Sequence, residues 1–152
     1  MQVLTRAIIK KLNEAGARYE GEFNENNDRH GKGRVVYIDG TYYEGQWFNG
    51  KREGWGEQRY SDGTLYKGEW KNDHKEGFGK IYYPNGNVVS ASFKNDLRHG
   101  KGSFESPDGK RTDCVYYNDL EIKVSEQNPD NYGWAGANFG LVVIIFFLII
   151  FW

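Results

Sequence analysis

The sequence predicts a mainly β protein, an elongated antiparallel sheet built from β-hairpin repeats, and three observations support that fold class. A five-residue pattern with an aromatic residue at each end and a central glycine recurs along the chain. Pairs of glycines recur in step with it, and an Asp-Gly or Asn-Gly dipeptide follows each pair. A fixed period in the twenties indicates stacked supersecondary units, and short aromatic segments bounded by turn dipeptides are typical of hairpin strands.

The first copy of the pattern is Tyr19-Glu20-Gly21-Glu22-Phe23. Further copies begin at Tyr43, Tyr66 and, in weaker form, Val89, at offsets of 24, 23 and 23 residues. The glycine pairs are Gly31/Gly33, Gly54/Gly56, Gly77/Gly79 and Gly100/Gly102, and the turn glycines are Gly40, Gly63, Gly86 and Gly109. We therefore expect each repeat to be a hairpin plus a loop.

Two prolines indicate the geometry of the turns. In Tyr83-Pro84-Asn85-Gly86 and Ser106-Pro107-Asp108-Gly109, proline is second and glycine fourth. A type I turn followed by a left-handed glycine suits that order, whereas a two-residue loop would place proline where an N–H must close the ladder. The resulting register sets small residues opposite one another across neighbouring strands. The predicted pairs are Gly33 with Gly45, Gly56 with Gly68, Gly79 with Ala91, and Gly102 with Cys114.

Residues 1–18 are predicted to form an amphipathic helix that covers one edge of the sheet. The apolar residues of a single helical stripe are Val3, Leu4, Ala7, Ile8 and Leu12, with Gly16 as the helix stop. The basic residues are Arg6, Lys10, Lys11 and Arg18, against one acid, Glu14. Two interpretations stay open, a plain edge cap and a retained organelle-import signal. Residues 120–124 are expected to cover the opposite edge.

Residues 134–152 are predicted to form a single C-terminal transmembrane helix, after a polar linker over residues 125–133. The segment carries no charge, and at about 1.5 Å per residue it gives roughly 28 Å of helix, against a hydrocarbon core of about 30 Å. The run from Leu141 to Trp152 is apolar on every side, which argues against a surface helix. Candidates for packing against a partner helix are Gly136, Asn138 and Gly140. The small residues among them equally suit a helix that simply begins at the membrane interface.

Charge and motif content argue against several classes of function. The 152-residue chain has 20 basic and 21 acidic side chains, without the Lys/Arg excess typical of a nucleic-acid-binding domain. No motif places a nucleophile, a base and an orienting group together, so we expect no enzymatic activity, no metal and no cofactor. His30 and His99 occupy matching positions three repeats apart, about 29 Å in a flat sheet, and are too distant to share a metal. Cys114 is the single cysteine and cannot form an internal disulfide.

The order of a Tyr-x-Gly-x-Trp pattern, a Gly-x-Gly pair and a turn glycine resembles the MORN (membrane occupation and recognition nexus) repeat over about residues 19–117. The resemblance implies an elongated, twisted antiparallel sheet with a grooved face, which we assign to residues 19–124. Relatives use such sheets for protein contacts, dimerisation or lipid head groups. The later copies lose the first tyrosine and the first glycine of the pattern, so we expect the groove to change character toward Val89 and Thr112.

These features indicate a non-catalytic accessory or scaffold subunit of a membrane protein complex, with the sheet as its protein-contact platform. Expected partners are other subunits of the complex and, through residues 134–152, the lipid bilayer, with no nucleic acid. Aromatic side chains anchor protein contacts, although internal packing is expected to claim at least half of these rings. The predicted contact face comprises Tyr43, Trp47, Tyr60, Tyr66, Trp70, Tyr83 and Phe93.

An alternative function and an alternative location remain open. A junctophilin-like tether would bind anionic lipid through the sheet, because loops at residues 49–53 and 94–99 carry cations, although acids are interleaved with them. A retained cationic N-terminal segment with a single span favours the mitochondrial inner membrane. The endoplasmic reticulum or another endomembrane is the alternative.

Overall fold

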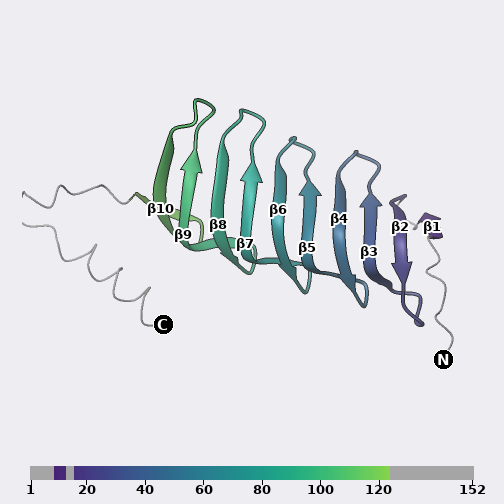
Figure 1. Cartoon of the computed structure of the whole chain (residues 1–152). Helices are drawn as coiled ribbons and strands as arrows, with labels where there is room; N and C mark the ends of the chain where they lie inside the picture. The colour runs from purple at the N-terminus through teal and green to yellow at the C-terminus, as the bar shows by residue number, and fades with distance from the viewer. Residues whose placement is uncertain (1–8, 13–15, 124–152) are drawn as a thin grey trace, which may run out of the picture.

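The computed structural model describes residues 9–12 and 16–123, which form one open antiparallel sheet of eleven strands (Figure 1). The strands are β1 (Ile9–Leu12), β2 (Arg18–Phe23), β3 (Arg29–Val36), β4 (Tyr42–Phe48), β5 (Lys51–Arg59), β6 (Leu65–Lys71), β7 (His74–Tyr82), β8 (Val88–Lys94), β9 (Leu97–Glu105), β10 (Arg111–Tyr117) and β11 (Leu120–Lys123). Each strand pairs with the next one in the chain. The predicted hairpin-repeat fold is therefore confirmed.

The bulged hairpin turn that the prolines indicated is present. In the turn between β7 and β8, the Tyr83 N–H donates to the Asn87 carbonyl oxygen (2.9 Å) and the Gly86 N–H donates to the Tyr83 carbonyl oxygen (2.9 Å). Gly86 has a φ of 85°, in the left-handed region that favours glycine. Pro84 fits the second position because the turn uses no N–H there.

The predicted register is also confirmed. Small residues face one another across eight consecutive strand pairs, from β2 with β3 to β9 with β10, and form one row that runs across the strands. The observed pairs include Gly33 with Gly45, Gly56 with Gly68, Gly79 with Ala91, and Gly102 with Cys114.

Tyrosine rings fill the space above these small residues. A Cβ atom added at Gly56 would lie 2.3 Å from the Tyr43 hydroxyl oxygen and 2.5 Å from a ring carbon. Tyr43 is fully buried, and its hydroxyl donates to the Gln46 carbonyl oxygen at 2.9 Å. Tyr19 and Tyr66 repeat the arrangement in their own repeats. Burial raises the pKa of Tyr19 to about 12, so its hydroxyl remains a protonated donor at neutral pH.

The rings form a continuous row that connects one repeat to the next. Tyr43 packs edge-to-face against Trp47 of its own repeat (5.0 Å between centroids) and Trp70 of the next (5.4 Å). Tyr66 does the same with Trp70 and Phe93. Edge-to-face pairs of this kind add about 0.5–1.5 kcal/mol beyond the area they bury. The core is therefore this row of rings on one face of the sheet, together with the small and aliphatic residues packed beside it.

The predicted N-terminal helix is wrong over Ile9–Leu12, which form the edge strand β1. This strand pairs with β2, with Ile9 opposite Gly21 and Leu12 opposite Arg18. A strand satisfies the backbone groups at the edge of β2, which a helix cannot do, and this tertiary advantage outweighs the helical pattern. Gly16, expected as a helix stop, has a φ of 74°. Residues 1–8 and 13–15 lie outside the described residues.

At the C-terminal edge β11 pairs with β10 along Cys114–Tyr117, as expected for residues 120–124, although Val124 is outside the described residues. The predicted linker over 125–133 and the predicted transmembrane helix over 134–152, with Gly136, Asn138 and Gly140, are also outside them. Within the part of the chain that the structure describes, no helix has the length and hydropathy needed to cross a membrane.

Replacing Gly56 by alanine is expected to lower the free energy of unfolding by about 1–3 kcal/mol, because the new methyl group overlaps the Tyr43 ring. Urea denaturation measures the change. Lys101→Ala, on an exposed side chain between Gly100 and Gly102, is the control and should change stability by less than about 0.5 kcal/mol. Equal stability of the Gly56→Ala and wild-type proteins would contradict this account of the core.

Candidate contact surface

Strand alternation gives the sheet two unlike faces. The ring-bearing face carries the buried tyrosines together with the small residues they cover. We call the opposite side the outer face, because its side chains have no layer of rings over them. From the strand register, its residues include Lys32, Arg34, Tyr42, Glu44, Gln46, Trp55, Glu57, Lys67, Phe78, Lys80 and Lys101.

Most of the predicted contact rings belong to the core. Five of the seven are no more than 4% exposed: Tyr43, Trp47, Tyr66, Trp70 and Phe93. Tyr60 and Tyr83 are partly buried and pack against these rings. Internal packing therefore claims at least half of the predicted strip, as expected. A partner on this face would have access mainly to the exposed parts of Tyr60 and Tyr83.

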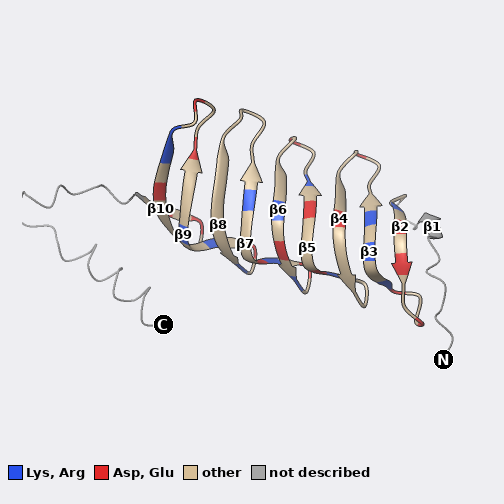
Figure 2. Ribbon diagram, viewed as in Figure 1, with Lys and Arg blue, Asp and Glu red and all other residues tan. Residues whose placement is uncertain are grey.

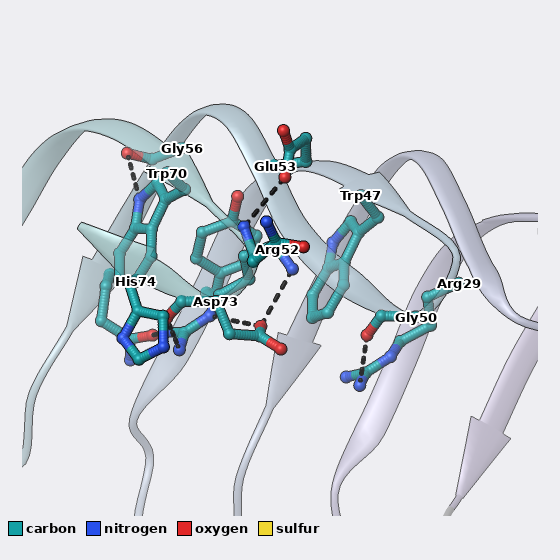
Figure 3. A network of polar contacts seen from close by, with 12 residues as sticks. Arg29, Trp47, Gly50, Arg52, Glu53, Gly56, Trp70, Asp73 and His74 are labelled. Carbon is teal, nitrogen blue, oxygen red and sulfur yellow. Dashed lines mark hydrogen bonds and ion pairs between the residues drawn. The ribbon is translucent and has the colours of Figure 1, made fainter. Parts of the chain in front are cut away.

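A row of cations covers the rings near the turns. The Arg29 guanidinium lies 4.1 Å from the Trp47 ring centroid, and the Arg52 guanidinium lies 4.1 Å from that of Trp70 (Figure 3). Lys75 and Arg98 follow at the same 23-residue period, over Tyr66 and Tyr116. Each cation is attracted to the negative face of a ring. We call Arg29, Arg52, Lys75 and Arg98 the cation ladder.

The three arginines of the cation ladder also donate to the two-residue turn of the next repeat. Arg52 contacts Asp73 through a Nε–Oδ1 distance of 3.1 Å and donates from Nη2 to the Asp73 carbonyl oxygen at 2.7 Å (Figure 3). The Asp73 carboxylate also accepts from the Arg52 backbone N–H at 2.9 Å. Asn72 and Asp73 both have positive φ, 49° and 70°, as a type I′ turn requires. Arg98 and Asp119 repeat this arrangement in the last repeat.

Two large aromatic side chains are exposed on the outer face. Trp55 is 53% exposed and Phe78 is 46% exposed. Each is the middle residue of a Gly-x-Gly pair, in consecutive repeats, and the same position holds Lys32 and Lys101 in the repeats on either side. These two rings were not among the predicted contact residues. The sequence did contain a signal for them. The residue between the two glycines of each pair points to the face opposite the buried tyrosines, and in two repeats that residue is aromatic.

A groove lies beside Trp55 on the outer face. It has a volume of 810 Å³, and its floor is the backbone of Gly21, Gly33 and Gly45. Arg34 and Glu44 form an ion pair within its lining, at 3.5 Å. A second cavity of 390 Å³ shares the Lys32 and Gln46 side chains with this groove and extends to the exposed ring of Phe48. The outer face is therefore hollowed at the N-terminal repeats, whereas the expected groove was tied to the tyrosines and glycines of the repeat pattern.

A polar network continues across the outer face next to the groove. Tyr42 donates to the Glu57 carboxylate, and Lys67 Nζ lies 2.7 Å from the same carboxylate. Partial burial acts to raise the pKa of Glu57, but hydrogen bonds from Lys67 and Tyr42 outweigh it and lower the pKa below its ordinary value. Glu57 is therefore a carboxylate that bridges β4 and β6 at neutral pH.

Charges of both signs alternate over the sheet (Figure 2). No group of three or more His, Cys, Asp or Glu side chains within residues 9–12 and 16–123 is placed to hold a metal ion. His74 pairs with Asp96, with 2.6 Å between Nδ1 and Oδ2, at an exposed turn. The buried Cys114 thiol donates to the Tyr116 hydroxyl. The outer face therefore presents exposed aromatic rings, the glycine backbone of the groove and charged side chains that are already paired.

Comparison with known protein families gives one match. The family model of the MORN repeat matches four consecutive segments, residues 19–42, 43–65, 66–88 and 90–111. These segments coincide with the hairpins that carry the ring row and the cation ladder. No curated protein gives a significant match to the chain.

Replacing Arg52 by methionine is expected to cost about 2 kcal/mol of unfolding free energy, because it removes the cation over Trp70 and the charge-assisted bonds to Asp73. Urea denaturation provides the measurement. Arg59→Met, on an exposed arginine of the same strand, is the matched control and should have a small effect. Similar losses for the two variants would show that the cation ladder does not hold the repeats together.

Glu57→Gln is expected to lower the free energy of unfolding at pH 7. At acidic pH the variant and the wild-type protein should be equally stable. Because the folded-state pKa of Glu57 is lowered, its charge stabilises the fold above the ordinary value of 4.5, and that contribution disappears as pH falls through the folded-state pKa. Unfolding free energies of both proteins measured between pH 7 and about pH 3 should therefore converge. A difference that stays constant across this range would contradict the assigned role; Glu44→Gln serves as the exposed control.

Proposed function

Since the chain belongs to the MORN repeat family, whose repeats generally mediate protein or membrane-lipid contacts, we propose that it is a non-catalytic platform that docks another protein on its outer face. The observation that carries this proposal is the pair of exposed rings, Trp55 and Phe78. Trp55 lies in β5 and Phe78 in β7, and the ring row packs against the opposite face of these strands. Rigidly held aromatic side chains are the usual anchors of protein contacts because they bury large area at low entropic cost.

The surroundings of these rings favour a protein partner over an anionic bilayer. Membrane attraction requires several cations free to meet lipid phosphates, at about 1 kcal/mol for each. Three members of the cation ladder, Arg29, Arg52 and Arg98, are occupied by rings and turn carbonyls or carboxylates. On the outer face, Arg34 and Lys67 pair with glutamates. The junctophilin-like tether is therefore the second candidate.

The finer proposal is an accessory subunit of a membrane complex. Its support is the uncharged run of residues 134–152, long enough for a single span. The mitochondrial inner membrane is the favoured site, with another endomembrane as the alternative, because basic residues accompany an apolar pattern near the N-terminus. Since Ile9–Leu12 lie in the sheet, an import role would rest on residues 1–8, and edge covering is the better supported role of β1.

The test is purification of the full-length chain in mild detergent with its bound proteins. A Trp55→Ser/Phe78→Ser double variant is expected to recover at least about tenfold less of a defined partner set, because a lost anchor costs 1.4 kcal/mol or more. Tyr117→Ser, which removes a ring of similar exposure near the C-terminal edge, is the control and should retain the partners. Circular dichroism establishes that the double variant keeps its sheet.

Equal recovery with the double variant and the control would exclude the outer face as the docking surface. Binding of the full-length protein to vesicles containing anionic lipid, lost at high salt and unaffected by the double variant, would instead favour the tether. Turnover of a substrate by the purified protein would contradict the non-catalytic assignment.

A further inference from the structure

In each of the first three repeats, one side-chain oxygen accepts the backbone N–H that follows the first glycine of the Gly-x-Gly pair. Gln46 Oε1 accepts from the Trp55 N–H at 3.0 Å, and Glu69 Oε1 accepts from the Phe78 N–H at 3.0 Å. Glu22 makes the same bond in the first repeat, at 3.4 Å. This N–H therefore takes a carboxylate oxygen in two repeats and an amide oxygen in the other.

The fourth repeat lacks this internal acceptor. Ser92 stands one 23-residue period after Glu69, and its side chain is shorter. A Cβ atom added at Gly100 would have no atom within 4 Å apart from those of its neighbours in the chain, whereas one added at Gly77 would lie 2.6 Å from the Glu69 carboxylate. Among the described residues, no side chain accepts from the Lys101 N–H. The space that a carboxylate fills in the third repeat is therefore accessible in the fourth.

Two lysines flank this position. Lys101 itself carries the N–H, and Lys80 of β7 lies opposite Ser90, two residues before Ser92 in β8. Both lysine side chains are exposed, and no carboxylate within residues 9–12 and 16–123 forms an ion pair with either of them. Because a cation beside a backbone N–H strengthens the attraction for an anion, this part of the outer face favours a negatively charged group.

An anchor ring of the proposed docking surface adjoins the same position. Phe78 is 46% exposed and lies directly opposite Ser92. The strands β7, β8 and β9 are consecutive in the sheet, at a spacing of about 4.8 Å. A partner segment that packs on the Phe78 ring is therefore within reach of Ser92 and the Lys101 N–H.

We propose that a carboxylate of the docked protein binds at the Lys101 N–H, with Lys80 and Lys101 as its counter-charges. Glu69 is the precedent, since it fills the equivalent position of the third repeat with a carboxylate of this chain. The partner would supply the acceptor that Ser92 does not. This inference rests on the proposed docking function and narrows the partner to a protein with an aspartate or glutamate next to the residue that packs on Phe78.

The donor set favours a carboxylate over a lipid phosphate. In the third repeat a single backbone N–H takes one oxygen of a glutamate side chain. Phosphate groups are typically held by several backbone N–H groups at once. The exposed ring beside the position also suits a protein segment, which carries apolar and acidic side chains together.

Ser92→Glu tests the proposal in the full-length protein, because it restores the internal carboxylate of the third repeat and blocks the position. Recovery of the defined partner set in mild detergent is expected to fall at least about tenfold relative to wild type. Ser61→Glu adds the same charge at the exposed turn between β5 and β6 and is the control that should retain the partners. Equal recovery with Ser92→Glu and Ser61→Glu would overturn the proposal.

The Trp55→Ser/Phe78→Ser variant separates this failure from failure of the proposed function. Loss of the partners in that variant but not in Ser92→Glu would leave the docking surface standing and reject the carboxylate position. Retention of the partners in both variants would reject the docking surface itself.

Carbodiimide cross-linking of the detergent-purified assembly identifies the bound group, because the reagent joins a lysine amine to a carboxylate in contact with it. Peptide mapping should find Lys80 or Lys101 joined to an aspartate or glutamate of a bound protein, at least about tenfold less often in Ser92→Glu. Links from other lysines alone would contradict the proposed position. Anionic vesicles that bind the wild-type chain but not Ser92→Glu, with no protein link at either lysine, would reassign the position to a lipid phosphate.

Hydrogen exchange provides a measurement that needs no partner. In the purified full-length chain, after its partners have been removed, the Lys101 amide should exchange at least about tenfold faster than the Phe78 amide, whose acceptor is internal. Ser92→Glu should slow exchange at Lys101 and leave Phe78 unchanged. Equal protection of the two amides in the wild-type chain would show that the position is already filled and would sink the proposal.

Discussion

The packing of a tyrosine ring flat against glycine backbone is the constraint on which this structure depends. A single-layer sheet has no second layer to bury its aromatic side chains, so the space must come from within the sheet. The missing Cβ atoms of the Gly33, Gly56 and Gly79 positions provide it, and Tyr19, Tyr43 and Tyr66 occupy it. The tryptophans then pack on the edges of these rings, and the cations cover the tryptophans.

The two faces of the sheet therefore have different roles. The rings, hydroxyls and guanidinium groups of the ring-bearing face already have partners, and their contacts join each repeat to the next. The outer face carries the exposed Trp55 and Phe78 and the groove over Gly21, Gly33 and Gly45. The outer face, on which we propose that a partner docks, is therefore the side that carries none of the ring row.

The candidate site was less predictable than the fold, for physical reasons. Periodic residues reveal themselves by recurrence, and Tyr43 or Trp70 recur because every repeat needs a ring over a glycine. Such rings can pack internally only where the glycine backbone beneath them lets the ring come close. The spacing of residues along the sequence does not reveal that distance. Trp55 and Phe78 replace the lysines found at their position in other repeats, so no recurrence marks them.

The sequence by itself determined the hairpins, their turns and their register, because glycine, proline and asparagine act through local backbone geometry that neighbouring residues already specify. Only the tertiary structure decided that Ile9–Leu12 form a strand. Their apolar spacing suits a helix, but the unpaired backbone edge of β2 is created by folding and selects a strand. Burial of the ring row and exposure of the outer-face rings were likewise decided by contacts between repeats, which no single repeat contains.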